Sequence, residues 1–297
     1  MFDDIGTYLG QFGTEGTGNG QFSYPGDVGV DSNGDVYVAD TGNHRVQKFT
    51  SIGTYIMQWG GPGSGDGQFY QPERIVVSAI DEIYVTDHDN CRVQVFNTVG
   101  VFQRKFGTVG SGNANLYLPI GIALFKLSSS SSSSSSFSSY SSISLAPDLL
   151  YIADTYNHRI QVYDYDGNYI FSFGSYGFGN GQFNYPGGVV VSGDDEVFVA
   201  DTGNHRIQVF DREGNYLRQW GSYGSGIGPF FRHPERIDLD AAGLVYITDQ
   251  DGDRVQVFDR FGNYIRTFGT GGTGPGAFDT VKGIGIHYVK GGLSLAP

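Results

Sequence analysis

The sequence predicts an all-β fold, a six-bladed β-propeller built of four-stranded antiparallel blades. The segment ADTGNHRVQKF at 39–49 recurs, with substitutions, at 86–96, 153–163, 200–210 and 248–258. Neighbouring copies begin 47, 67, 47 and 48 residues apart, and a period of this size is typical of repeat architectures. Glycine accounts for 47 of the 297 residues and aromatic residues for 15%. This composition favours many short strands joined by tight turns, with rings packed between sheets.

The fourth copy shows how one repeat makes four strands. A short apolar run at 184–192 follows the preceding connector and predicts the innermost strand. The alternating segments 196–201 and 206–211 predict the second and third strands, joined by the loop TGNH. The segment 215–221 predicts the outer strand, after a turn in which Gly214 suits a positive φ.

The chain ends predict how the ring closes. An outer-strand signature occurs six times, as GQFG, MQWG, RKFG, FSFG, RQWG and RTFG. The last is followed by a sixth inner strand at 281–289, and the chain begins with the end of a third strand and an outer strand. We therefore expect a single domain over 1–297, whose sixth blade combines the N- and C-terminal segments and leaves no exposed sheet edge.

Blade 3 differs from the others by a serine-rich insertion at about 127–146. A serine tract buries too little apolar surface to order itself. The default interpretation is inert low-complexity sequence; a flexible tether or a glycosylated segment are the alternatives.

The charge balance excludes some partners. The formal net charge of -13 disfavours a phosphate backbone, which needs basic patches, and favours a basic partner or a cation. No apolar run reaches 18 residues, so no membrane span is expected. The single cysteine, Cys91, permits no internal disulfide.

Each repeat carries an aspartate and an arginine on either side of its hairpin loop. Two side chains facing each other across such a loop can form a cross-strand ion pair, and five near-identical copies indicate a structural role. The pairs are Asp40 with Arg45, Asp87 with Arg92, Asp154 with Arg159, Asp201 with Arg206, and Asp249 with Arg254.

Two repeats break the pattern in matching ways. PERI replaces the glycine-containing start of the inner strand in blades 2 and 5, which lie opposite each other in a six-bladed ring. Opposed arginines at the channel mouth could clamp a carboxylate or another anion; pairing of each arginine with its neighbouring glutamate is the structural alternative. The predicted ligand-binding residues are Glu73, Arg74, Glu235, Arg236 and Asp238.

The sequence gives only weak indications of a metal site. His44, His158 and His205 share one hairpin position in different blades, too far apart to surround one ion. The loop DQDGDR places Asp249, Asp251 and Asp253 like the start of a calcium loop, without its glycine and distal glutamate. We expect no cofactor, with calcium at these three aspartates as the weak alternative.

The succession of proline, apolar strand, VYVADTGNHRIQVFD-like hairpin and GNYLRQWG-like outer strand resembles the NHL-repeat family over essentially the whole chain. That family includes interaction and sensor domains, RNA-binding domains of tripartite-motif proteins and, more distantly, peptidyl-hydroxyglycine amidating lyases. One scaffold hosts unrelated activities, so the resemblance implies the fold more strongly than the function.

The function predicted from these features is a non-enzymatic binding or scaffold propeller. It would present a protein, peptide or glycan site on the loop face around the channel mouth. The alternatives are a metal-dependent lyase or hydrolase that uses the central channel, and a structural subunit of an extracellular assembly. No nucleic-acid partner is expected and self-association is left open. An extracellular or cell-surface location is slightly favoured over a cytoplasmic one.

Overall fold

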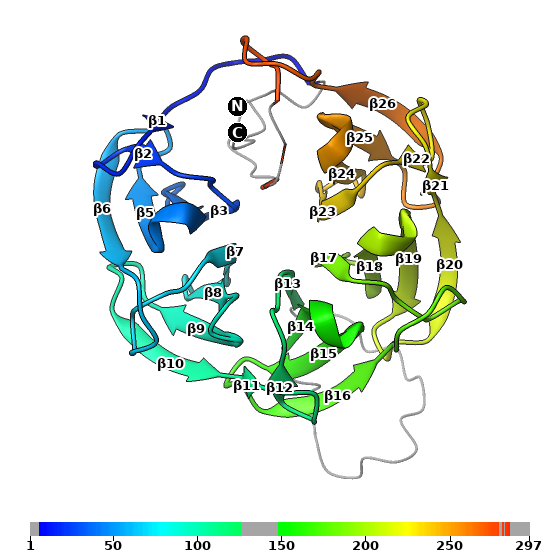
Figure 1. The fold of residues 1–297 in the computed structure, drawn as a ribbon, viewed down its shortest axis with the longest axis horizontal. Helices are drawn as coiled ribbons and strands as arrows, with labels where there is room; N and C mark the ends of the chain where they lie inside the picture. Colours follow the sequence, from blue (N-terminus) through cyan, green and yellow to red (C-terminus); the bar gives the residue numbers. More distant parts are fainter. Residues whose placement is uncertain (1–5, 126–147, 279–280, 282, 286–297) are drawn as a thin grey trace.

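The computed structural model describes residues 6–125, 148–278, 281 and 283–285. These residues form a ring of four-stranded antiparallel blades that follow one another in chain order, as predicted (Figure 1). The innermost strand of each blade borders the centre of the ring, and the outermost strand lies at its rim. The predicted serine-rich insertion lies outside the described residues.

Five blades are detected, not the six predicted. Blade 1 comprises β3 (Asp27–Val30), β4 (Val36–Asp40), β5 (Arg45–Phe49) and β6 (Tyr55–Gly60). Blade 2 comprises β7 (Pro72–Val77), β8 (Ile83–Asp87), β9 (Arg92–Phe96) and β10 (Phe102–Phe106). Blade 3 comprises β13 (Ile122–Phe125), β14 (Leu149–Asp154), β15 (Arg159–Asp164) and β16 (Tyr169–Phe173). Blade 4 comprises β17 (Pro186–Val191), β18 (Glu196–Asp201), β19 (Arg206–Asp211) and β20 (Tyr216–Trp220). Blade 5 comprises β23 (Pro234–Leu239), β24 (Val245–Asp249), β25 (Arg254–Phe258) and β26 (Tyr264–Phe268).

The connectors between blades contain short parallel strand pairs. These are β1 (Thr14–Glu15) with β2 (Gln21–Phe22), β11 (Thr108–Val109) with β12 (Asn115–Leu116), and β21 (Ser222–Tyr223) with β22 (Phe230–Phe231). Four hairpin loops are single 3₁₀ turns: η1 (Thr41–Asn43), η2 (Thr155–Asn157), η3 (Thr202–Asn204) and η4 (Gln250–Gly252). Among the described residues, no helix is long and apolar enough to cross a membrane.

The predicted sixth blade rests largely on residues outside the described ones. The parts of the two chain ends that are described do lie between blade 5 and blade 1. Val281 and Ile284 are buried in one cluster with Tyr246 and Phe268 of blade 5. A Cβ added at Gly285 would meet Val28 of blade 1. A C-terminal segment therefore lies between the first and last described blades.

The predicted aromatic series fills the space between blades. Phe49 and its four equivalents on the third strands are each at most 1% exposed. Burial of this kind stabilises the fold by roughly 1.5–3 kcal/mol for each ring. The five residues are Phe49, Phe96, Tyr163, Phe210 and Phe258.

Each predicted Asp–Arg pair forms a salt bridge, with N–O distances between 2.6 and 2.9 Å, and each aspartate is fully buried. In blade 4, the Asp201 carboxylate accepts hydrogen bonds from Arg206 Nε at 2.7 Å and Asn204 Nδ2 at 2.8 Å. A third side chain, Gln208, also donates to Asp201, at 3.0 Å. Buried charge is tolerated only when it is paired and hydrogen-bonded, and this network provides both.

The same side chains tie each blade to the connector that precedes it. Gln208 Nε2 donates to the Gln182 carbonyl at 2.7 Å, and Gln208 Oε1 accepts the Gly181 N–H at 2.9 Å. Arg206 Nη2 donates to the carbonyls of Gly179 and Gln182. The sequence motifs did not predict a role for this glutamine, although it recurs in every copy of the repeat, at Gln47, Gln94, Gln161, Gln208 and Gln256.

Two of the three hairpin histidines, His44 and His158, bond to the connector that follows their blade. His44 and His158 end their 3₁₀ turns in the left-handed conformation, with φ of 55°. His44 Nδ1 accepts the backbone N–H of Gln71 at 3.0 Å, and His158 Nδ1 accepts that of Tyr185 at 3.1 Å. These contacts support the loop-turn interpretation of the histidines.

Replacing Gln208 by alanine should test the hairpin network. The change leaves the Gly181 N–H without its acceptor and removes one of the donors to the Gln182 carbonyl and to the buried Asp201 carboxylate, so we expect the free energy of unfolding to fall by about 1–3 kcal/mol. Gln103→Ala, at an exposed position of β10, should change it by less than about 0.5 kcal/mol. Urea denaturation of both variants gives the comparison. Equal losses in the two would show that the buried glutamine has no special role.

Candidate functional site

The centre of the ring is built from one column of the repeat. Asp27, Arg74 and Arg236 occupy the same position near the start of inner strands β3, β7 and β23. Glycine occupies this position in the other aligned repeats, as Gly121, Gly188 and Gly283. A Cβ added at any of these glycines would lie within 3 Å of a neighbouring inner strand's backbone. The small residues therefore let the inner strands approach, while the charged side chains occupy the centre.

The charged side chains form a buried cluster that spans the ring. Arg236 Nη2 donates to Glu73 Oε2 at 2.7 Å, which joins blades 5 and 2 directly. The same nitrogen lies 3.6 Å from Glu235 Oε1. Arg236 is fully buried, and Glu73 and Glu235 are each 8% exposed. This arrangement matches the structural alternative, in which the arginines pair with glutamates, and extends it across the ring.

Arg74 is held by a different partner. Its Nε lies 3.3 Å from Asp27 Oδ2, and its Nη2 donates to the Ile237 carbonyl at 3.4 Å. Asp27 Oδ2 also accepts the Ile75 N–H at 3.0 Å. In blade 4, Gly188 stands where blade 1 has Asp27, so the approximate twofold symmetry predicted for the ring does not extend to the surroundings of the two arginines.

Burial controls the ionisation of this cluster. It raises the pKa of the Asp27 carboxyl above its ordinary value, and the positive charges of Arg74 and Arg236 only partly oppose this. Burial acts to lower the pKa of Arg236, but the neighbouring carboxylates outweigh it and the pKa is raised.

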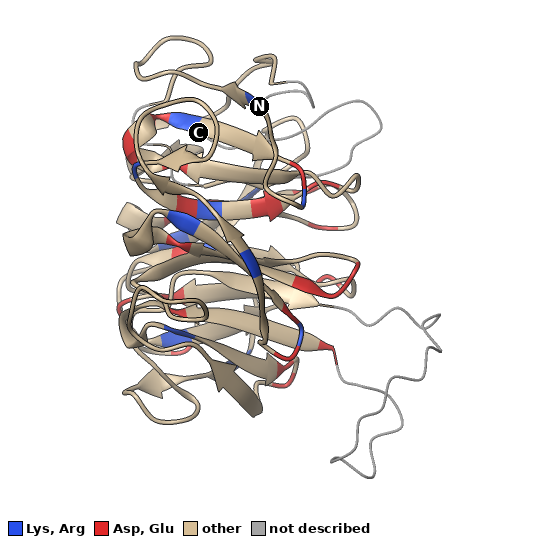
Figure 2. Ribbon diagram, turned by 90° about the vertical axis from the view of Figure 1, so that its right-hand side faces the viewer, with Lys and Arg blue, Asp and Glu red and all other residues tan. Residues whose placement is uncertain are grey.

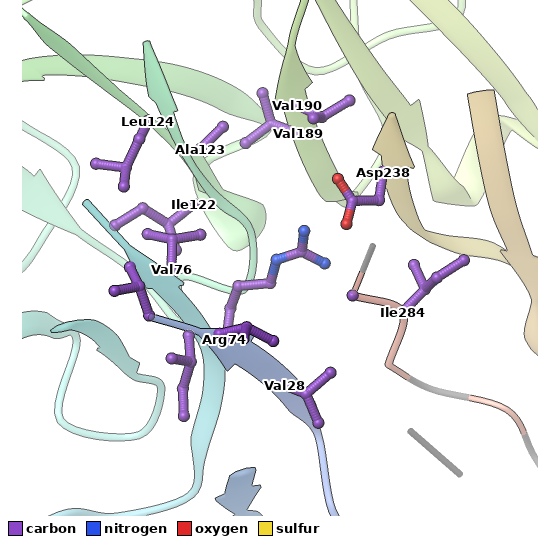
Figure 3. A pocket seen from close by; sticks show the side chains of 15 residues that line it. Val28, Arg74, Val76, Ile122, Ala123, Leu124, Val189, Val190, Asp238 and Ile284 are labelled. Atoms are coloured by element: carbon purple, nitrogen blue, oxygen red, sulfur yellow. The ribbon is translucent and has the colours of Figure 1, made fainter. Parts of the chain in front are cut away.

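A cavity of about 240 Å³ adjoins the cluster on one side. Arg74 reaches into it from β7, and Asp238 of β23 faces it from the opposite wall (Figure 3). The remaining wall is mainly apolar, with contributions from Val28, Ile122, Val189 and Ile284. Arg74 is only 4% exposed, yet its Nε and Nη1 atoms have no hydrogen-bond partner.

The cavity opens toward one end of the ring. Inner strands β7, β17 and β23 are buried where they begin, beside the hairpin loops, and half-buried at their last two residues. We call the end with the hairpin loops the hairpin face, and the end with the turns that follow the inner and third strands the turn face. The buried ion cluster lies near the hairpin-face ends of the inner strands, and the cavity lining extends to Val30 and Val77 at their turn-face ends.

The turn face is strongly acidic. Figure 2 shows acidic residues along the turns at its right-hand side. The turns after the inner strands include Asp31, Asp35, Asp81, Glu82, Asp194, Asp195, Glu196 and Asp240. The turns after the third strands add Asp164, Asp166, Asp211, Glu213 and Asp259. Lys48, Arg104, Arg212, Arg218 and Arg260 form salt bridges with seven of these thirteen carboxylates, so acidic groups outnumber their basic partners on this face.

The structure separates the five residues predicted to bind a ligand. Arg74 and Asp238 line the cavity, whereas Glu73, Glu235 and Arg236 are engaged in the buried cluster. The two arginines therefore do not face each other across an open channel mouth, as the sequence suggested they would. Asp27 was missed, although its place in the same repeat column as Arg74 and Arg236 could have identified it as their acidic partner.

The aspartates of DQDGDR have other roles. Asp249 accepts hydrogen bonds from Arg254 Nε and from the backbone of Arg232 and His233. The Asp251 side chain is 65% exposed, and Asp253 ends the 3₁₀ turn in the left-handed conformation. Within the described residues, no three histidine, cysteine or acidic side chains gather to hold a metal ion. The calcium site has no geometric support here.

Comparison with known proteins supports the repeat family and the fold. The NHL repeat model matches residues 22–49, 69–96 and 183–210. Among solved structures, a gluconolactonase from Xanthomonas campestris has a TM-score of 0.60 at 14% identity, covering 90% of this chain and 81% of its own. A streptogramin B lyase has a TM-score of 0.59 at 14% identity, with coverages of 88% and 72%. A nidogen/laminin complex has a TM-score of 0.58 at 17% identity, with coverages of 86% and 83%. A search of curated proteins found no match.

Replacing Asp27 by asparagine should alter the pH dependence of stability. Because burial raises the pKa of Asp27 in the folded protein, its contribution to stability is full below its unfolded pKa of about 3.8. That contribution is lost as the pH rises through the folded pKa. Asp27→Asn removes this loss, so wild type should become progressively less stable than the variant as the pH rises from about 4 to 8. Urea denaturation across this range measures the difference, and a constant difference would contradict a raised pKa.

Proposed function

We propose that this NHL-repeat β-propeller is a non-enzymatic binding module for a protein or peptide segment, which docks on the turn face and inserts a carboxylate into the central cavity. The observation that carries the proposal is the Arg74 guanidinium. It is almost fully buried and points into the cavity; its Nη1 has no hydrogen-bond partner, and its Nε has only the 3.3 Å ion-pair contact with Asp27. A buried donor without a partner is costly, so a ligand that supplies acceptors gains the corresponding free energy.

A carboxylate suits Arg74 best. A guanidinium offers parallel N–H groups that match the two oxygens of a carboxylate, and such charge-assisted hydrogen bonds are stronger than neutral ones. Asp27 contacts only one edge of this guanidinium, through Nε. The end of the guanidinium extends into the cavity (Figure 3), and its Nη1 has no hydrogen-bond partner.

The size of the cavity limits the inserted group. Its volume of about 240 Å³ is below the roughly 300–1,000 Å³ of pockets that enclose drug-sized ligands. An acidic side chain or the C-terminal residue of a peptide is a better match, and the apolar wall residues Val28, Ile122 and Val189 would pack against its carbon atoms. The rest of the ligand would lie on the turn face.

The charge of the turn face determines which ligand residues are favoured on either side of that carboxylate. A face with this excess of carboxylates attracts basic molecules and repels acidic ones over several ångströms. We therefore expect a ligand with an isolated carboxylate within an otherwise basic segment. The glycan ligand, the lyase alternative and the role in an extracellular assembly receive no comparable support from described contacts.

Two matched peptides provide the test. Ac-Lys-Lys-Gly-Val with a free C-terminus carries the proposed combination, and its C-terminal amide lacks only the carboxylate charge. We expect the free acid to bind at least about tenfold more tightly than the amide, which corresponds to about 1.4 kcal/mol. Arg74→Met should abolish this preference, while Lys105→Met, at an exposed position of β10, should retain it. Fluorescence anisotropy of labelled peptides measures all of these affinities.

The preference is a ratio within one protein variant, so a moderate loss of stability in Arg74→Met does not obscure it. Equal affinities of the acid and the amide for the wild type would refute the proposed role of Arg74. Tighter binding of Ac-Glu-Glu-Gly-Val than of the basic peptide would refute the role of the acidic turn face.

A further inference from the structure

A second candidate binding surface lies on the hairpin face, away from the cavity. Five aromatic side chains there are between 44% and 69% exposed, and a histidine completes the group. They come from the hairpin loop of blade 3 and from the connectors that precede blades 3 and 4. We call this group the aromatic patch: Tyr117, Tyr156, His158, Tyr176, Phe178 and Tyr185.

The rings of the aromatic patch are in continuous contact. Tyr156 lies between Tyr117 and Tyr185, with ring centroids 5.7 and 5.0 Å away. His158 contacts Tyr185 at 4.6 Å and Tyr176 at 4.9 Å, and Tyr176 contacts Phe178 at 6.0 Å. The interplanar angles lie between 60° and 71°, so adjacent rings meet edge to face. Such a row presents ring faces in several orientations rather than one flat surface.

One substitution in the repeat completes the patch. Tyr156 is the middle residue of 3₁₀ turn η2, where the equivalent turns η1 and η3 have Gly42 and Gly203. The turn keeps the same geometry, because its C-terminal histidine has φ of 55° in all three cases. Folding of the turn therefore does not require the tyrosine. A large apolar ring exposed in place of glycine is a cost unless it contacts a partner.

The surroundings of the patch are uncharged. The segments 107–121 and 167–193, which contain most of the patch, include no aspartate, glutamate, lysine or arginine. Asp154 and Arg159 in the adjoining hairpin are paired with each other. Burial lowers the pKa of His158, which keeps its ring uncharged at neutral pH. These features favour a neutral partner rather than a basic, acidic or phosphorylated one.

The hydrogen-bonding groups of the patch are mainly tyrosine hydroxyls. Within the described residues, the hydroxyls of Tyr117, Tyr156, Tyr176 and Tyr185 donate no hydrogen bond. The side-chain amides nearby are already engaged. Asn157 Nδ2 donates to the Gly110 carbonyl and to Asp154, and Asn184 Nδ2 donates to the Gly203 carbonyl.

From these observations we infer that the aromatic patch binds a proline-rich segment in the polyproline II conformation. The carbonyl groups of such a segment make no internal hydrogen bonds, so they can accept from the tyrosine hydroxyls. Its proline rings can pack on the exposed faces of the aromatic rings, and its extended conformation is largely preformed, which lowers the entropic cost of binding.

The test uses a blocked, fluorescein-labelled decaproline peptide. We expect saturable binding to the full chain, measured by fluorescence anisotropy. Tyr156→Gly recreates the sequence of the equivalent turns and should weaken binding about tenfold or more, since aromatic anchors dominate such interfaces. The matched control is Tyr223→Ser. Tyr223 contacts His205 at 4.9 Å as Tyr176 contacts His158, but it lies outside the patch, so the control should bind like the wild type.

A labelled Gly-Ser decamer should not bind, and a neutral oligosaccharide such as cellohexaose should not displace decaproline. The inference is overturned if decaproline shows no saturable binding, or if Tyr156→Gly binds it as the wild type does. Binding of cellohexaose in preference to decaproline would assign the patch to a glycan instead. A concentration-dependent dimer that Tyr156→Gly abolishes, measured by analytical ultracentrifugation, would assign it to a second copy of the chain.

Discussion

The structure depends on a buried carboxylate that recurs at the hairpin of every described blade. Each of these aspartates accepts hydrogen bonds from an arginine of the facing strand and from the backbone of the preceding connector. The arginine and a buried glutamine then bind connector carbonyls. A buried charge with several partners can be satisfied in one geometry only, so each hairpin fixes the path of the chain between blades. Without this hydrogen-bond network, the glycine-rich connectors would have few interactions to fix their conformation.

Repetition of this network explains why the functional residues lie elsewhere. A side chain that every blade needs for folding cannot readily acquire a role in one blade alone. The positions that vary between blades lie outside this network. The inner-strand column holds glycine or a charged residue, and the middle of the hairpin turn holds glycine, an aspartate or Tyr156. The first position gives the ring its ion cluster and cavity, and the second gives the hairpin face its aromatic patch.

The fold was predictable from sequence because it depends on local, repeated features. Strand alternation, turn residues and the Asp–Arg spacing all recur, and blade boundaries followed from them. The site was predictable only in part. The repeat break identified Arg74 and Arg236, but pairing across the ring depends on how side chains from separate blades share a buried space. Arg236 pairs with Glu73, which lies 163 positions earlier in the sequence, whereas Arg74 contacts Asp27 and extends into the cavity. The aromatic patch arises from the packing of neighbouring blades, so no single sequence motif predicted it.

If the ion cluster blocks access to the centre of the ring from the hairpin face, a ligand reaches Arg74 from the turn face. A crystal structure of the protein soaked with para-iodobenzoate tests this directly, because iodine is located by its anomalous scattering. We expect the carboxylate within hydrogen-bond distance of Arg74 Nη1 and the iodine displaced toward the turn face. An iodine peak on the hairpin side of Arg236, or an Arg74 guanidinium fully hydrogen-bonded within the protein, would contradict it.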